Sequence, residues 1–254
     1  MSDYKVNGLD LFAEHFKDFS NNYVIVGGTA CYLAMHDIGL NFRATKDIDM
    51  IVTVEEISHE FGAKFWEFIR LGGYQVYRTK EGAPQFFRFM NPTNPNYPAM
   101  IELFSRKQDM FPDISESIFT PIVIDDEISS LSAILLNDEY YSFLKSGRTE
   151  INGIAILKPT HLIAFKAKAF VDLTRKKNGG AHVNSVDIKK HKNDVFRLVQ
   201  LLTEGEVLNV SDSVKDDIRT FIELMKNEQI DTKALDVPIT QEEAMNIISE
   251  VFEL

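Results

Sequence analysis

Several features are missing from this chain, and each absence excludes a class of protein. The single cysteine, Cys31, excludes an intramolecular disulfide and any zinc site built from several cysteines. No apolar run approaches the roughly 20 residues that a membrane-spanning helix needs. The opening residues lack the basic region and apolar core of a signal peptide. We therefore expect a cytoplasmic protein that does not engage a membrane.

Common catalytic motifs are missing as well. The six histidines show no metal-ligand spacing such as H-E-x-x-H. Neither G-x-S-x-G nor a Walker pattern occurs, which removes support for a serine hydrolase or a P-loop enzyme. Metal-dependent phosphohydrolases usually include histidine ligands, so this class is disfavoured too.

What is present is the composition of a soluble globular protein, with 254 residues that are 44% hydrophobic and 26% charged. The net charge of -11 is unevenly distributed, because residues 158–197 alone carry about +7. This segment is the one place that attracts polyphosphate or a nucleic-acid backbone. On charge alone, a solvated helix face that balances the acidic remainder is the preferred explanation.

Hydrophobic periodicity divides the chain into two parts. In the first part, strand patterns alternate with the helical patterns of residues 9–20, 29–39, 55–73 and 137–147. The predicted strands are residues 23–28, 47–54, 84–90, 98–105, 131–136 and 151–157. Only helical patterns follow Pro159. We predict an α+β fold: a mixed sheet flanked by helices over residues 1–157, then an all-helical domain over residues 158–254.

A glycine pair, Gly27 and Gly28, follows the apolar stretch YVIV and precedes a helical pattern. Glycines at such a junction let a ligand approach the backbone, and the free N–H groups of a helix N-terminus favour phosphate. Thr29 adds a hydroxyl at the same place. The pattern alone also fits a tight turn with Thr29 as the helix cap.

Two aspartates, Asp47 and Asp49, open the next predicted strand. Residues i and i+2 of a strand point to the same face, so the two carboxylates are expected side by side. Like charges that close repel each other unless a cation lies between them, and Mg²⁺ is usually held by one or two carboxylates plus substrate phosphates. A metal site and a polar strand entry both remain open.

A third acid, Glu102, lies within the apolar run AMIELFS. A glutamate among apolar residues costs free energy unless it is paired or ligates a metal. The other interpretation is an edge strand on which Glu102 faces water. Three carboxylates from two strands can hold two divalent ions. Asp109 and Asp113, in a predicted loop, are rival third acids that rank below Glu102.

Together these features resemble a known family. The stretch VIVGG followed by Thr29, the run RATKDIDMIV and a later strand with an acid look like the nucleotidyltransferase fold of DNA polymerase β-like enzymes. Within that superfamily, residues 27–52 are most similar to the AbiEii/AbiGii toxin type. Members of that type carry an Arg-x-Ser/Thr-x-Asp-x-Asp run after a longer first helix. Glu102 is the weaker match, because the third acid is often Asp.

The resemblance implies roles for individual residues. It implies that a triphosphate is bound by Gly27, Gly28 and Thr29. It also implies that Mg²⁺ is ligated by the acid triad, whose third member acts on the attacking hydroxyl; this triad is Asp47, Asp49 and Glu102. Arg43 and Thr45 belong to the same run, and Arg43 either holds a phosphate or braces the loop by pairing with an acid. We favour the bracing role.

In the helical half, the resemblance implies a basic residue against the nucleotide phosphates. Lys166 lies within an apolar helical stripe, where a lysine either reaches the edge or enters a cleft. Lys192 and Asp194 match the family's late Lys–Asp helix, with Asn193 between them. The alternative for this pair is that both are surface charges.

Two functions follow as hypotheses. The first is a Mg²⁺-dependent nucleotidyltransferase that moves a nucleoside monophosphate from an NTP to a hydroxyl of a tRNA, a protein or a small molecule. The subfamily resemblance implies the toxin of a toxin–antitoxin or phage-defence pair, with an antitoxin protein as partner. The second is a catalytically inactive nucleotidyltransferase-like protein that binds a nucleotide or a partner.

Overall fold

The computed structural model describes residues 6–52, 59–78, 85–105, 120–121, 134 and 137–254. Two compact units share the chain. The first unit comprises Met1–Leu33, Arg43–Ile124 and Arg148–Leu157, and the second comprises Ala34–Phe42, Asp125–Gly147 and Lys158–Leu254. Two segments that precede Leu157, namely Ala34–Phe42 and Asp125–Gly147, belong to the second unit, and the domain limits 1–157 and 158–254 stay a prediction.

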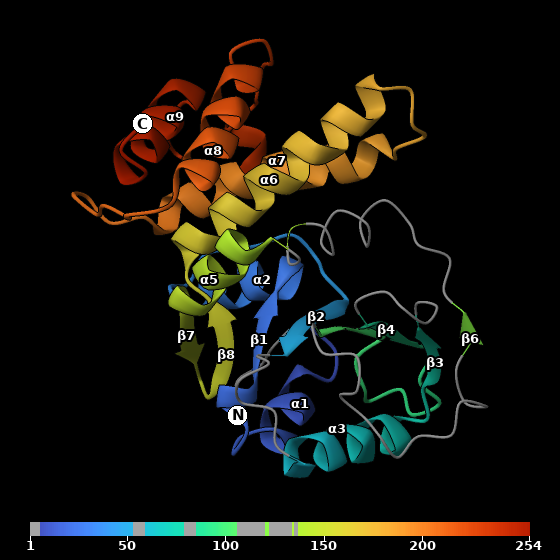
Figure 1. Ribbon diagram of the computed structural model, residues 1–254. Helices are drawn as coiled ribbons and strands as arrows, with labels where there is room; N and C mark the ends of the chain where they lie inside the picture. The colour runs from blue at the N-terminus through green and yellow to red at the C-terminus, as the bar shows by residue number, and fades with distance from the viewer. Residues whose placement is uncertain (1–5, 53–58, 79–84, 106–119, 122–133, 135–136) are drawn as a thin grey trace. The chain divides into compact units, whose positions relative to one another are not determined.

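The first unit is built on an eight-stranded mixed sheet (Figure 1). Its strands are β1 (Tyr23–Val26), β2 (Asp47–Val52), β3 (Gln75–Arg78), β4 (Gln85–Met90), β5 (Met100–Ser105), β6 (Thr120–Pro121), β7 (Arg148–Ile151) and β8 (Ile154–Leu157). Their order across the sheet is β6-β3-β4-β5-β2-β1-β8-β7. The parallel pairs are β2–β5, β1–β8 and β3–β6, and the other neighbours are antiparallel. With helices on this sheet and an all-helical C-terminal part, the predicted α+β class is confirmed.

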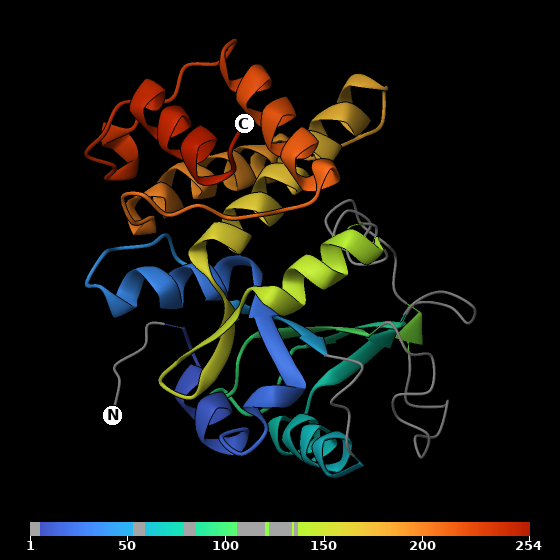
Figure 2. The same cartoon turned by 60° about the vertical axis from the view of Figure 1, so that its left-hand side comes forward.

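Two helices of this unit, α1 (Leu9–His15) and α3 (His59–Gly72), lie on one face of the sheet (Figures 1 and 2). Their aromatic side chains meet those of the strands. Phe12 lies 5.5 Å from Tyr23 and Phe65 lies 5.4 Å from Phe89, measured between ring centroids. Burial of such large apolar side chains is the dominant stabilising term for this layer. The residues that alternate with Tyr23 and Phe89 along their strands therefore face the opposite side.

The predicted single strand at residues 151–157 is instead a β-hairpin. Strands β7 and β8 pair from Ile151 to Ile154 around Asn152 and Gly153, whose φ angles are 51° and 78°. An Asn-Gly pair with both φ angles positive is a strong hairpin signal, because it matches the twist of the flanking strands. The Asn-Gly pair therefore predicts this turn from the sequence, although the apolar run alone does not indicate it. The predicted strand at 131–136 lies outside the described residues, except for Ile134.

The described part of the second unit is built from helices. They are α5 (Asp138–Ser146), α6 (Pro159–Asn178), α7 (Ser185–Leu198), α8 (Asp212–Met225) and α9 (Gln241–Val251), and helix α2 (Gly27–Asp37) enters this unit at Ala34. Short 3-10 turns occur in this unit at Val199–Leu201 and Lys233–Leu235, and in the first unit at Ser20–Asn22. Helices α6 and α7 form an antiparallel pair joined at residues 179–184 (Figures 1 and 2). The side chain of Asn184 caps α7 by accepting from the Val186 N–H.

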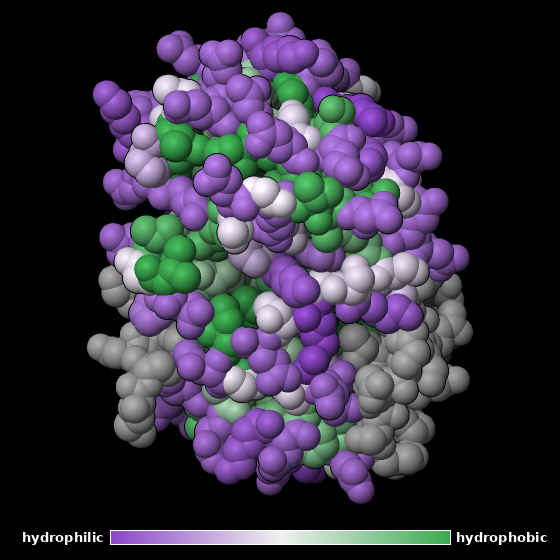
Figure 3. All heavy atoms as spheres, turned by 90° about the vertical axis from the view of Figure 1, so that its left-hand side faces the viewer, coloured by the Kyte–Doolittle hydropathy of each residue, from purple (hydrophilic) through white to green (hydrophobic). Residues whose placement is uncertain are grey.

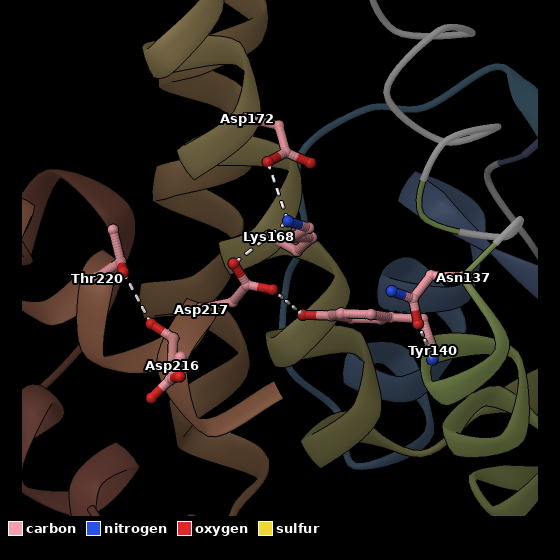
Figure 4. Close-up of polar contacts among 7 residues, drawn as sticks. All are labelled: Asn137, Tyr140, Lys168, Asp172, Asp216, Asp217 and Thr220. Carbon is pink, nitrogen blue, oxygen red and sulfur yellow. Dashed lines mark hydrogen bonds and ion pairs between the residues drawn. The ribbon is translucent and has the colours of Figure 1, made fainter. Parts of the chain in front are cut away.

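Buried polar groups join three of these helices (Figure 4). Asp217 of α8 accepts a hydrogen bond from the Tyr140 hydroxyl of α5 at 3.0 Å. Lys168 of α6 lies 3.2 Å from Asp217 and 3.1 Å from Asp172. Burial and the Asp217 carboxylate raise the pKa of Tyr140, so its hydroxyl keeps its proton and acts as the donor.

Candidate active site on the sheet

The junction of β1 and α2 lies against the carboxylate of Asp49. Gly27 has a φ of +67°, which L side chains rarely adopt. A β-carbon at this position would stand 1.7 Å from Oδ2 of Asp49, so only glycine lets the carboxylate approach. The chain thus brings Asp49 directly onto the backbone at the start of the helix.

Gly28 is contacted by the loop that precedes β2. A β-carbon on Gly28 would stand 2.8 Å from Oγ1 of Thr45 and 3.3 Å from Nη2 of Arg43. Arg43 also donates a hydrogen bond to the Ala44 carbonyl at 3.3 Å. The structure therefore brings Arg43 and Thr45 to the glycine pair, while the roles that the resemblance implies for them stay predictions.

Thr29 fixes the start of β2. Its buried hydroxyl donates a short hydrogen bond to the carbonyl oxygen of Asp47. Because the hydroxyl proton is used in this bond, Thr29 would bind an anion through its backbone N–H and not through its side chain. The first N–H groups of a helix have no partner within the helix and carry its positive dipole end, so they attract phosphate.

Asp47 and Asp49 occupy the first and third positions of β2, and both are half-buried. Ile48, by contrast, is fully buried on the face that packs against α1 and α3. The two aspartates therefore share the opposite face of the strand, as predicted. Their hard carboxylate oxygens, close to a helix N-terminus, have the donor chemistry that fits Mg²⁺ with bound phosphates.

Glu102 does not face water on an edge strand. Strand β5 lies inside the sheet between β4 and β2, and the Glu102 side chain is 13% exposed. The parallel register places Glu102 opposite Asp49. The antiparallel register on the other side places it opposite Arg88, whose Nε donates to Oε1 of Glu102 at 2.7 Å. The edge-strand interpretation is wrong, and Glu102 is ion-paired.

The environment of Glu102 opposes its negative charge. Burial raises its pKa first, and the neighbouring Asp49 carboxylate raises it further, while the Arg88 guanidinium acts in the opposite direction. A hydrogen bond between the Glu102 and Asp49 carboxyl groups makes a further, smaller contribution to this rise in the pKa of Glu102. The geometry thus couples Asp49, Glu102 and Arg88 as one electrostatic unit.

Of the two predicted aspartates, only Asp49 is a register partner of Glu102. Asp47 is opposite Met100 rather than Glu102 in the β2–β5 register. Within the described ranges, no group of three or more His, Cys, Asp or Glu side chains is arranged to hold a metal ion. Ligation of Mg²⁺ by all three acids therefore stays a prediction. Asp109 and Asp113, the rival third acids, lie outside the described residues.

Arg88 was missed when only the sequence was considered. It is the one charged residue in the stretch QFFRFM, and period-2 alternation sets it on the face opposite Phe87 and Phe89. The sequence signal that could have identified Arg88 was a single cation on one face of a strand rich in aromatic residues. Its pairing with Glu102 depends on a strand register that the sequence alone does not show.

The two predicted phosphate-binding lysines lie in the second unit, and both are paired. Nζ of Lys166 lies 3.2 Å from Oδ2 of the fully buried Asp194, which Arg197 also approaches at 3.5 Å. Lys192 pairs with Glu228. Lys166 thus neither reaches the surface nor stands alone within the apolar stripe, because a buried carboxylate from α7 balances it. Asp194 is accordingly not a surface charge.

Comparisons with known proteins add similarities at low identity. No family model and no curated protein matches the chain. A nucleotidyltransferase-like antigenic protein from Paracoccidioides brasiliensis is 14% identical with a TM-score of 0.44, over 96% of this chain and 94% of that one. The Cid1 poly(U) polymerase with MgGTP is 11% identical with a TM-score of 0.31, over 94% of this chain and 75% of that one. Its complex with ApU is 10% identical with a TM-score of 0.31, over 87% and 66%. At these values the similarity assigns no activity to this chain.

One further finding concerns membranes. Across the described ranges, no helix is long and apolar enough to cross a bilayer.

Proposed function

We propose that this chain is a nucleotidyltransferase that moves a nucleoside monophosphate from an NTP to a hydroxyl acceptor. The supporting observation is the contact between Gly27 and the Asp49 carboxylate, at the N-terminus of α2. This contact sets an anion-binding helix end beside two aspartates on one strand face. A triphosphate and a divalent ion are the ligands that suit such a pairing.

The reaction forms one bond and breaks one. The acceptor oxygen bonds to the α-phosphorus of the NTP, and the bond from that phosphorus to the bridging oxygen of the β-phosphate breaks. Pyrophosphate leaves, and the hydroxyl proton passes to a base, for which Glu102 is the proposed residue. When bound, Mg²⁺ supplies neutralisation of the phosphate charge. Asp47 and Asp49 are its proposed ligands, while the glycine pair orients the phosphates.

The acceptor we favour is a polynucleotide. The end of the α6–α7 pair, residues 175–192, carries six lysines and arginines against one aspartate, in a chain of net charge -11. Among them Arg175, Lys177 and Lys189 are exposed. Clustered cations of this kind attract a phosphodiester backbone. We refer to residues 175–192 as the basic hairpin.

Other parts of the proposal are supported by the sequence resemblance only. These are the AbiEii-type subfamily, the toxin role, an antitoxin partner, a cytoplasmic location and contacts of Lys166 and Lys192 with nucleotide phosphates. The pairing of Lys166 with Asp194 fits a lysine that is held in one position.

Transfer from labelled NTPs tests the proposal. The wild type, incubated with Mg²⁺, each α-³²P-labelled NTP and total RNA, is expected to label RNA. Asp49→Asn is expected to lower the rate by roughly 10²-fold or more, because it removes a ligand charge from the site. Asp18→Asn, the same chemical change at an exposed position, is expected to leave the rate unchanged. Equal labelling by all three proteins contradicts the proposal.

A catalytically inactive nucleotide- or partner-binding protein is the second candidate. The pairing of Arg88 with Glu102 favours it, because this pair engages the third acid. Calorimetry separates the two functions. NTP binding that needs no metal and survives Asp47→Asn supports a binding protein, whereas the enzyme requires binding that depends on both.

A further inference from the structure

A row of three charged side chains crosses the sheet of the first unit. Asp49 of β2, Glu102 of β5 and Arg88 of β4 are register partners on three neighbouring strands. Directly opposed residues of adjacent strands point to the same face, so backbone pairing sets Glu102 between an aspartate and an arginine. The row lies on the face away from the aromatic layer of α1 and α3.

Arg88 holds one oxygen of the Glu102 carboxyl group with two donors. Its Nε lies 2.7 Å and its Nη2 lies 2.5 Å from Oε1. The side chains of Arg88 and Glu102 are 17% and 13% exposed, so little water competes for this contact. The two donors belong to one rigid planar group, and together they fix the position of Oε1. The other oxygen of Glu102, Oε2, is left able to make a further contact.

From this geometry we infer that Arg88 is a positioning residue, which holds one oxygen of Glu102 and thereby presents the other oxygen to the divalent ion beside Asp49. Strand β5 lies between β4 and β2, so Arg88 and Asp49 flank Glu102 from opposite sides. An oxygen that is turned to Arg88 leaves its twin on the Asp49 side. The inference rests on the proposed function and deepens it, because it names the group that orients the third acid.

Orientation, rather than charge alone, is the contribution that the fork of Arg88 makes. A glutamate side chain has several rotatable bonds, and without support it populates more than one rotamer. Residues that orient the acids of a metal site typically alter affinity or activity about 10–100-fold. A lysine keeps the charge but offers a point charge on a flexible stem, so it does not reproduce the fork. Arg88→Lys therefore separates orientation from simple neutralisation of Glu102.

A crystal structure of the wild type soaked in Mn²⁺, with the ion located by anomalous scattering, tests the geometry without catalysis. We expect both Arg88 donors to remain on one oxygen of Glu102 and the other oxygen to be the nearer one to the ion. The inference is overturned if the ion lies nearer to the oxygen that Arg88 holds, if Arg88 has left Glu102, or if no ion lies beside Asp49.

A double-variant cycle in Mn²⁺ affinity, followed by electron paramagnetic resonance without nucleotide, tests whether Arg88 acts through Glu102. Arg88→Lys is expected to weaken Mn²⁺ binding by about tenfold in the wild type. In the Glu102→Gln background the same substitution is expected to change it by less than about twofold, because the oriented acid is already lost. Arg219→Lys, the same change at an arginine that is 48% exposed, is expected to leave the affinity unchanged. Equal weakening by Arg88→Lys in both backgrounds overturns the inference.

Transfer kinetics give a third measurement. Arg88→Lys is expected to lower kcat by about 10–100-fold and to change KM for the NTP by less than about threefold, since the acid and not the nucleotide loses its support. A variant that is folded by circular dichroism and keeps both its Mn²⁺ affinity and its kcat overturns the inference. If Arg88→Lys does not fold, Arg88→Gln takes its place, and the Mn²⁺ structure needs no variant.

Failure of the proposed function has a different signature. A wild type that places Mn²⁺ as described but transfers no label refutes the enzyme and leaves the positioning role of Arg88 intact. A wild type that transfers label, but in which Arg88 leaves Glu102 when Mn²⁺ binds, refutes the positioning role and leaves the enzyme intact.

Discussion

At the scale of single residues, Gly27 meets two requirements that no other amino acid meets. Its φ of +67° costs an L residue roughly 1–2 kcal/mol. A β-carbon would also overlap Oδ2 of Asp49, so that carboxylate must move. We expect Gly27→Ala to lower the free energy of unfolding by more than this strain alone and to abolish nucleotide transfer. Urea unfolding and the labelling assay measure the two effects.

Gly153 provides the matched control. Its φ of +78° imposes the same kind of strain, but a β-carbon there would meet nothing within 4 Å. Gly153→Ala is therefore expected to lower the free energy of unfolding by roughly 1–2 kcal/mol and to keep the full rate of nucleotide transfer. If both alanine variants retain transfer, the Asp49 contact with Gly27 has no role in catalysis.

The relative positions of site residues were predictable where those residues lie close together along the chain. Gly27 and Gly28 sit at one junction, and Asp47 and Asp49 are separated by two positions of one strand, so spacing alone predicts their geometry. The Arg88–Glu102 pair depends on the register between two strands, and the Lys166–Asp194 pair depends on how two helices pack. Periodicity carries no information on register or packing partners, so neither pair was predictable.

At the scale of elements, one carboxylate connects three helices of the second unit. Asp217 on α8 accepts from Tyr140 on α5 and pairs with Lys168 on α6 (Figure 4). Hydrogen bonds to charged groups contribute roughly 1.5–3 kcal/mol each, and Asp217→Asn keeps the shape but removes the charge. We expect this variant to lower the free energy of unfolding by about 1–3 kcal/mol, measured with urea and circular dichroism.

Asp216, the adjacent residue of the same helix, provides a control for the effect of an Asp-to-Asn substitution. Asp216 pairs with Arg219 one turn away, and its side chain is 71% exposed. Exposed pairs contribute roughly 0–1 kcal/mol, so Asp216→Asn is expected to change stability by less than about 0.5 kcal/mol. Equal losses at both positions would show that the Asp217 network adds nothing specific to the packing of α5, α6 and α8.

Most elements were predictable because hydrophobic periodicity and helix-terminal residues agree within them. Strand β3 was missed, since Gln75–Arg78 is only four residues long and begins two residues after Gly73, close to the end of α3. Such a short stretch gives too few periods to identify a strand, and its pairing with β4 decides its conformation. The β7–β8 hairpin was predictable from Asn152–Gly153.

At the scale of the whole molecule, the chain is acidic, and its positive charge is concentrated in one segment. Hydrophilic side chains cover most of the face in Figure 3, and hydrophobic ones appear there in separate small groups. The basic hairpin carries +5, so the rest of the chain carries -16. A protein of this charge is repelled by polyanions everywhere except at such a segment. Binding of RNA would therefore depend strongly on a few lysines and arginines.

Charge reversal at the end of the hairpin makes this dependence measurable. Lys177 and Lys189 are both exposed, one on each helix, and Lys177 donates to Ser185 across the turn at 2.7 Å. We expect Lys177→Glu/Lys189→Glu to weaken binding of fluorescent single-stranded RNA and to reduce the salt slope by about 0.7 for each phosphate that is no longer neutralised, measured by anisotropy. Lys17→Glu/Lys226→Glu changes the net charge equally at exposed lysines outside the hairpin. Since Coulomb attraction to a bound backbone is local at physiological salt, this control should retain affinity. Equal weakening by both double variants would mean that net charge, and not the hairpin, governs binding.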